Sequence, residues 1–133
     1  MLTIVALVFL VGFTLHTADH FRRGLDAITD QVLWAGTASS LLAITAVVLA
    51  LRGHRLAPLA AIAVGVSGIG IAVVHLAPHW SSFSDSLPDG HLDGFTWAAV
   101  ILEVLGALIF GGAGVHAVRA RATTPTIPTA ASA

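Results

Sequence analysis

Four long apolar runs dominate this sequence of 133 residues. A run of about 20 apolar residues, folded as a helix, is long enough to cross roughly 30 Å of hydrocarbon. The runs cover residues 2–20, 31–51, 57–77 and 95–118, and Glu103 is the only formally charged residue well inside any of them. A helix pairs its own backbone groups, whereas an open sheet in lipid leaves them unpaired. The sequence therefore predicts an all-α polytopic membrane protein, with four transmembrane helices in residues 1–121.

The composition agrees with a membrane protein and excludes several other classes. Hydrophobic residues make up 56% of the chain and charged residues 10%, whereas a typical soluble domain is about 25% charged. The chain has no cysteine, which excludes disulfides and cysteine-based metal centres. Six arginines against seven acidic residues leave a net charge of −1. Nucleic-acid binding therefore lacks an electrostatic basis, and we expect no nucleic-acid partner.

The arginines predict the orientation in the membrane. Four spans place both termini on one side, together with the connection over residues 52–56. That side carries Arg52, Arg55, Arg119 and Arg121, and the other side carries only Arg22 and Arg23. Because basic residues concentrate on the cytoplasmic side, we expect both termini in the cytoplasm and the protein in the cell (inner) membrane. Residues 122–133, rich in alanine, threonine and proline, are predicted to form a disordered tail.

Histidine is unusually frequent for so apolar a chain. His54 and His116 lie beside the cytoplasmic arginines, where we expect ordinary interfacial roles. The other five lie at the opposite side of the membrane: His16, His20, His75, His79 and His91. Within each of the pairs 16/20 and 75/79 the spacing is four residues, which places both rings on one helix face, one turn apart. Such a pair can hold one metal ion.

The two histidine pairs lie in similar segments. Residues 16–21 (HTADHF) and 75–80 (HLAPHW) share the pattern His-x-Ala-x-His-aromatic, at an offset of 59 residues. An aspartate follows the first histidine by ten residues in each copy, at Asp26 and Asp85. This similarity predicts an internal duplication, in which two helical hairpins are related by an axis along the membrane normal. The two histidine pairs would then face each other.

These residues predict a metal site at the extracytoplasmic face. Its ligand set is His16, Asp19, His20, His75 and His79, with His91, Asp93, Asp26, Asp85 and Glu103 as possible additions. Imidazole and carboxylate ligands suit Zn²⁺, Fe, Mn or Cu(II). Asp19 would serve as a ligand or as a partner that orients an imidazole. Alternatively, Asp93 and Asp30 would cap the helices that they precede, and Arg22 and Arg23 would pair with nearby acids or lie at the interface.

Glu103 and the glycines are the remaining features of the spans. An intramembrane carboxylate is costly and by default a functional candidate, here a deeper ligand, a proton acceptor or a neutral hydrogen-bonded acid. The third and fourth runs carry Gly65, Gly68, Gly70, Gly106, Gly111, Gly112 and Gly114. Small residues let helices approach closely in lipid, although glycine is also enriched in membrane helices generally.

Other functions fit the same residues. In a b-type haem electron carrier, one histidine from each hairpin, chosen from His16, His20, His75 and His79, would ligate the iron. In an accessory or assembly subunit of a larger membrane complex, or in a homo-oligomer, the polar residues would form helix–helix contacts. A pH-related role follows from the titration of histidine near neutrality. The spacing of the histidines does not distinguish a catalytic role of the metal from a storage or structural role. It therefore does not decide whether the protein is an enzyme.

Overall fold

The computed structural model describes residues 1–90 and 92–123. It contains the helices α1 (Leu2–Arg23), α2 (Asp30–Leu51), α3 (Ala57–Leu76) and α4 (Gly94–Ala122), and the short 3-10 helix η1 (Leu25–Ala27). No strand occurs within the described ranges. Each of the four long helices is long and apolar enough to cross a membrane, so the predicted all-α chain with four apolar helices is confirmed. His91 and residues 124–133, most of the predicted tail, lie outside the described residues.

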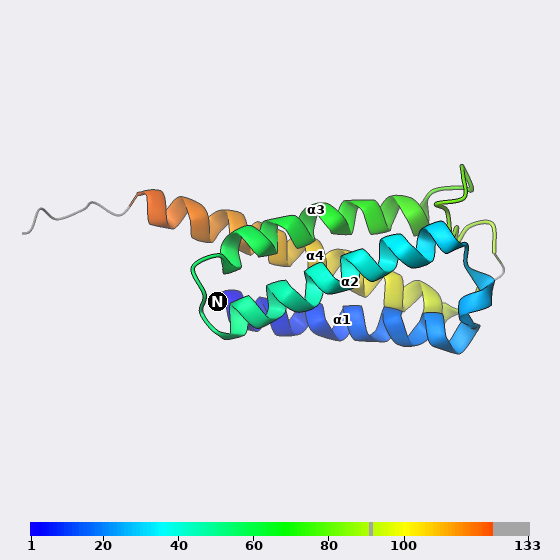
Figure 1. Cartoon of the computed structure of the whole chain (residues 1–133), viewed down its shortest axis with the longest axis horizontal. Helices are drawn as coiled ribbons and strands as arrows, with labels where there is room; N and C mark the ends of the chain where they lie inside the picture. The colour runs from blue at the N-terminus through cyan, green and yellow to red at the C-terminus, as the bar shows by residue number, and fades with distance from the viewer. Residues whose placement is uncertain (91, 124–133) are drawn as a thin grey trace, which may run out of the picture.

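The four helices form an elongated bundle (Figure 1). Helix α4 packs closely against both α1 and α3, whereas α1 and α2 are the least closely packed of the neighbouring pairs. Helix α2 runs diagonally across the bundle and diverges from α1 toward the end that carries η1 (Figure 1). We call this end, with η1 and the connection over residues 77–90, the polar end. Large apolar side chains such as Ile4, Leu41 and Ile109 are exposed on the outside, a distribution that suits a lipid environment.

The half of the bundle away from the polar end packs through small residues, and we call it the glycine half. Its core consists of Ala6, Phe9, Ala43, Ala46, Val47, Ala50, Ala57, Ala61, Val64, Ala107 and Phe110. A Cβ atom added to Gly111 would lie 2.7 Å from the Cα atom of Gly65, so the backbones of α3 and α4 touch there. The predicted close approach through glycine is confirmed at this pair. Gly70 and Gly112 instead face open space.

Two side chains cap the helices that begin at the polar end. Asp93 caps α4 and accepts a hydrogen bond from the Thr96 N–H at 3.0 Å, as predicted. Helix α2 is capped by Thr29, which accepts from the Val32 N–H at 3.3 Å. The predicted cap at Asp30 is wrong, because Asp30 is already helical and Thr29 has the extended backbone of an N-cap. The Thr29 hydroxyl also donates to the Ser82 carbonyl, which ties the start of α2 to the connection over residues 77–90.

Candidate metal centre

Three of the predicted histidines meet at the polar end of the bundle. His16 and His20 come from the last two turns of α1, and His75 comes from the last turn of α3. One ring nitrogen from each histidine lies within 4.8 Å of those from the other two. The His16 ring centroid is 4.6 Å from that of His20 and 4.7 Å from that of His75. The structure thus brings together candidate ligands from two helices that are far apart in the sequence.

His79 lies outside this group. Helix α3 ends at Leu76, and Ala77 is extended, because Pro78 disfavours the helical conformation in the residue before it. The predicted one-turn spacing of His75 and His79 on a single helix face is therefore wrong. His79 is exposed, and its main-chain N–H donates to the Asp89 carboxylate. Hydrogen bonds from Ser86 and from this N–H lower the pKa of Asp89.

His16 has one engaged and one free ring nitrogen. Its Nδ1 forms a hydrogen bond with the carboxylate of Glu103 on α4. Its Nε2 is buried and has no hydrogen-bond partner among the described residues. Histidines that bind metals commonly present one nitrogen to the ion and donate the other N–H to a carboxylate. This contact also explains why a carboxyl group occurs inside an apolar run, where Glu103 is only 5% exposed.

His75 is oriented in a similar way by the connection that follows α3. Its Nδ1–H donates to the main-chain oxygen of Asp85 at 3.1 Å. The connection folds back over the end of the helix, where the Leu87 N–H donates to the His75 carbonyl at 2.8 Å. A neutral ring that donates from Nδ1 carries a lone pair on Nε2. His75 therefore resembles His16 as a prepared ligand, although its partner is a carbonyl.

His20 differs from the other two members of the group. The Nη2 group of Arg23 lies 3.1 Å from its Nδ1. Arginine can only donate, so Nδ1 of His20 accepts this hydrogen bond. The Asp85 carboxylate lies 4.0 Å from the same nitrogen. To bind a metal through Nε2, His20 would have to exchange the arginine donor for this carboxylate, so it is the less prepared ligand.

A network of ion pairs, buried at Asp19, adjoins the histidine group. Asp19 is 0% exposed and faces arginines rather than the histidine group. It accepts hydrogen bonds from Arg22 Nη2 at 2.7 Å, Arg23 Nε at 3.1 Å and Thr96 Oγ1 at 3.1 Å. These bonds link α1 to the start of α4. Asp19, predicted as a ligand or an orienting partner, instead anchors the arginines.

The same arginines bind two further carboxylates. Arg23 Nη2 lies 2.7 Å from Asp85, and Arg22 Nη1 lies 2.9 Å from Asp93. Burial alone would raise the pKa of Asp85, but the hydrogen bonds and charge of Arg23 outweigh burial and lower this pKa. The pKa of Asp93 is lowered by the Thr96 N–H and by Arg22. Asp26 is exposed on η1 and is not a member of the three-histidine group.

The charges of the groups that contact the histidine group or one another do not balance. Asp19, Asp85, Asp93 and Glu103 contribute four carboxyl groups, and Arg22 and Arg23 contribute two guanidinium groups. Their formal charges leave −2 before any charge on histidine. A divalent cation among the three histidines would offset this excess.

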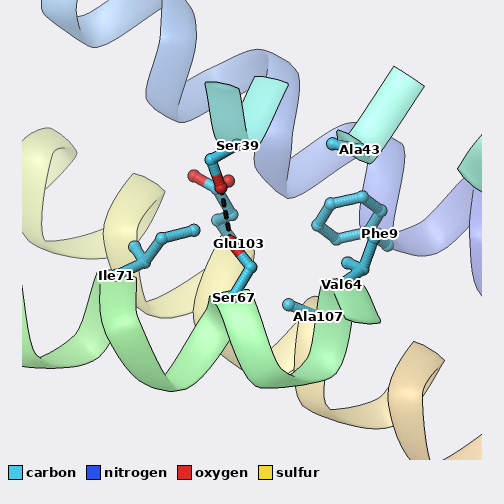
Figure 2. A pocket seen from close by; sticks show the side chains of 8 residues that line it. All are labelled: Phe9, Ser39, Ala43, Val64, Ser67, Ile71, Glu103 and Ala107. Atoms are coloured by element: carbon cyan, nitrogen blue, oxygen red, sulfur yellow. Dashed lines mark hydrogen bonds between the residues drawn. The ribbon is translucent and has the colours of Figure 1, made fainter. Parts of the chain in front are cut away.

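Two cavities adjoin Glu103, and the larger of them also adjoins the histidine group. The larger, of about 610 Å³, lies between α1, α2 and α3 and is lined by His16, His20, His75 and Glu103 among others. The smaller, of about 10 Å³, lies beside Glu103 (Figure 2), and this volume corresponds to one water molecule. There the hydroxyl groups of Ser39 on α2 and Ser67 on α3 share a hydrogen bond.

The contribution of α2 to these cavities was not predicted from the sequence. Ser39 lines both of them, and the larger cavity is lined by every residue over 35–40. The available signal was the run of six small residues AGTASS over these positions. Side chains of this size leave space beside a helix that stands away from its neighbours.

Comparison of the chain with protein families, with curated proteins and with solved structures found no match.

Proposed function

We propose that this chain is a small integral membrane protein that binds a divalent transition-metal ion through His16, His20 and His75. The observation that carries the proposal is the buried Nε2 of His16, which has no hydrogen-bond partner in the described part of the chain and lies beside two further imidazoles. A buried polar atom without a partner costs about 1–3 kcal/mol. A bound cation would remove that cost, and Glu103 on Nδ1 would strengthen His16 as a ligand.

The ligand set and the local charge both support a divalent ion. Three imidazoles suit Zn²⁺, Fe, Mn or Cu(II), and the formal charge of −2 on the four carboxyl and two guanidinium groups around them favours a dication. Zn–N bonds of about 2.0–2.1 Å would set the nitrogens about 3.3 Å apart. The three ring nitrogens now lie within 4.8 Å of one another. Their separations would have to shorten by at most about 1.5 Å to bind the ion. Three protein ligands also leave a coordination position open.

The proposal places the polar end at the extracytoplasmic face. Arg52, Arg55, Arg119 and Arg121 lie toward the opposite end of the spans, and basic residues concentrate on the cytoplasmic side. Arg22 and Arg23, the two at the polar end, are paired with carboxylates. The internal duplication of two hairpins stays a prediction.

Metal analysis of the purified protein tests the proposal. We expect about one metal ion per chain, and we expect its loss in His16→Ala and His75→Ala. His20→Ala should weaken binding less, because His20 is already engaged by Arg23. His79→Ala is the matched control, since this exposed histidine lies outside the group and should leave the metal content unchanged. Absence of stoichiometric metal from the wild-type protein would overturn the proposal.

A b-type haem is a second candidate, favoured by one specific observation. His16 and His75 come from different helices and adjoin a cavity of about 610 Å³, a volume in the range of small-molecule sites. The excess of carboxylates at the polar end opposes it, because haem carries two propionate groups. An absorption spectrum of protein from haem-sufficient cells separates the two candidates. A Soret band that is kept in His79→Ala and lost in His16→Ala would replace the metal proposal with haem.

A further inference from the structure

The end of the bundle opposite the polar end carries arginines without acidic partners, and we call it the basic end. Its arginines are Arg52 and Arg55, in the connection between α2 and α3, and Arg119 and Arg121, in the last turn of α4. All four are exposed. Within the described residues, the ion pairs formed by arginine all belong to the two arginines of the polar end. No acidic residue occurs over 1–18, 31–84 or 104–133, so these segments leave the positive charge uncompensated.

One hydrogen bond joins the two arginine-bearing segments of the basic end. Nη1 of Arg121 donates to the main-chain oxygen of Arg55 at 2.9 Å, which holds the Arg121 guanidinium group against the connection. A guanidinium group has five N–H donors, and this bond is the only one that Arg121 forms within the described residues. Arg119 precedes Arg121 by two residues, and side chains at this spacing lie on different faces of a helix. The fold therefore brings Arg55 and Arg121 together and leaves Arg119 apart from them.

Arg55 and Arg121 lie at the depth of the lipid phosphates. Helix α3 has 20 residues and is therefore about 30 Å long, which equals the thickness of the hydrocarbon core. Arg55 lies two residues before the start of this helix, in the head-group layer, and its hydrogen bond holds the Arg121 guanidinium group at the same level. Helix α4 continues past this level, since it packs against the start of α3 where a Cβ atom on Gly114 would lie 2.5 Å from the Pro58 carbonyl oxygen (Figure 1).

We propose that Arg55 and Arg121 together bind the phosphate group of an anionic phospholipid. Guanidinium groups bind phosphate through two parallel N–H donors, and lipid phosphate is the anion that a bilayer supplies at this depth. The uncompensated charge of the basic end favours a lipid of net negative charge over a zwitterionic one. Orientation in the membrane requires only that arginines lie on one side, whereas a binding site also requires that two of them are held together. The inference does not depend on the metal site.

Native mass spectrometry of the detergent-solubilised protein tests the inference. Titration with phosphatidylglycerol or with phosphatidylcholine measures the affinity for the first lipid that binds. We expect the wild-type protein to prefer phosphatidylglycerol by about fivefold or more, which is the factor expected from one arginine beside an anionic lipid. Arg121→Gln and Arg55→Gln should each reduce this preference to about twofold or less, and Arg55→Gln does so without removing the main-chain oxygen that Arg121 contacts.

Arg119→Gln is the matched control, because it removes the same charge from the same turn of α4 but from another face. It should keep most of the preference for phosphatidylglycerol, and circular dichroism checks that each variant keeps its helices. Equal losses in Arg119→Gln and Arg121→Gln would overturn the inference in favour of a diffuse attraction to all four arginines. Equal affinity of the wild-type protein for the two lipids would also overturn it.

A second measurement separates a lipid from a soluble phosphate compound. Equilibrium dialysis of the solubilised protein against labelled inorganic phosphate should show no saturable binding, because the proposed ligand is a lipid that is also held by its apolar chains. Saturable binding of inorganic phosphate that is lost in Arg121→Gln would replace the phospholipid with a soluble phosphate compound.

Discussion

The two halves of the bundle are held together by different interactions. In the glycine half, α3 and α4 touch through backbone atoms at Gly65 and Gly111, and the rings of Phe9 and Phe110 stack at 5.8 Å. At the polar end, the helices are joined by buried side-chain hydrogen bonds and ion pairs, and α2 stands away from α1. Close packing of α4 against α1 and α3 therefore fixes the positions of these three helices. That scaffold lets the polar end keep a cavity and an imidazole nitrogen that has no partner within residues 1–90 and 92–123.

Removing Arg23 should have the largest effect on stability. Arg23 is 12% exposed and binds both Asp19 and Asp85. Breaking a buried ion pair from one side leaves an uncompensated charge and costs about 3–5 kcal/mol. We therefore expect Arg23→Ala to lower the free energy of unfolding by this order, measured by titration with SDS in mixed micelles. Arg22→Ala should cost less, because Arg22 is 47% exposed. Equal losses in the two variants would contradict the distinction.

Gly111→Ala tests the close packing of α3 and α4 in the glycine half. The new Cβ would lie 2.7 Å from the Cα atom of Gly65, where only a backbone shift can make room. Overpacking of this kind costs about 1–3 kcal/mol. The neighbouring Gly112→Ala should be neutral or stabilising, because its Cβ meets nothing within 4 Å and alanine favours the helix by about 1 kcal/mol. The same SDS titration measures both, and an unaffected Gly111→Ala would show that the α3–α4 contact is adaptable.

Glu103→Gln tests whether the carboxylate of Glu103 strengthens His16 as a metal ligand. The amide keeps a hydrogen bond to His16 Nδ1 but removes the formal charge behind the ligand. Loss of a carboxylate partner of a metal-binding histidine typically weakens metal affinity about 10–100-fold. We expect a loss in that range by metal titration, with little change in the SDS midpoint. A variant that binds metal as tightly as the wild-type protein would show that Glu103 has only a structural role.

Acid should destabilise the polar end before the glycine half. The pKa of Asp85 is lowered in the folded protein by Arg23, so its ionised form contributes stability above its unfolded pKa of about 3.9. This contribution is lost as the pH falls from about 4 through the lower folded pKa. We expect the unfolding free energy of the wild-type protein to fall over this range and that of Asp85→Asn to fall less. Parallel pH profiles would reject the contribution of Asp85.

Local patterns predicted much of the candidate site. The four-residue spacing of His16 and His20 holds because Leu2–Arg23 is a continuous helix. The same spacing at His75 and His79 fails because Pro78 ends α3 between them. No local pattern pointed to the contact between His16 and Glu103, which are 87 residues apart. The pairing of Asp19 with Thr96 is equally remote in sequence, and such contacts depend on which helices pack together.

By itself, the sequence determined the four apolar helices and the concentration of histidine, aspartate and arginine at one end. These follow from hydropathy and from spacing along a helix, which are local properties. Only the tertiary structure decided that His75 joins His16 and His20, that Glu103 orients His16, and that α2 stands away to leave a cavity of about 610 Å³. The physical reason is that α4 packs against α1 and α3 at close range. That packing fixes which polar side chains meet in the interior.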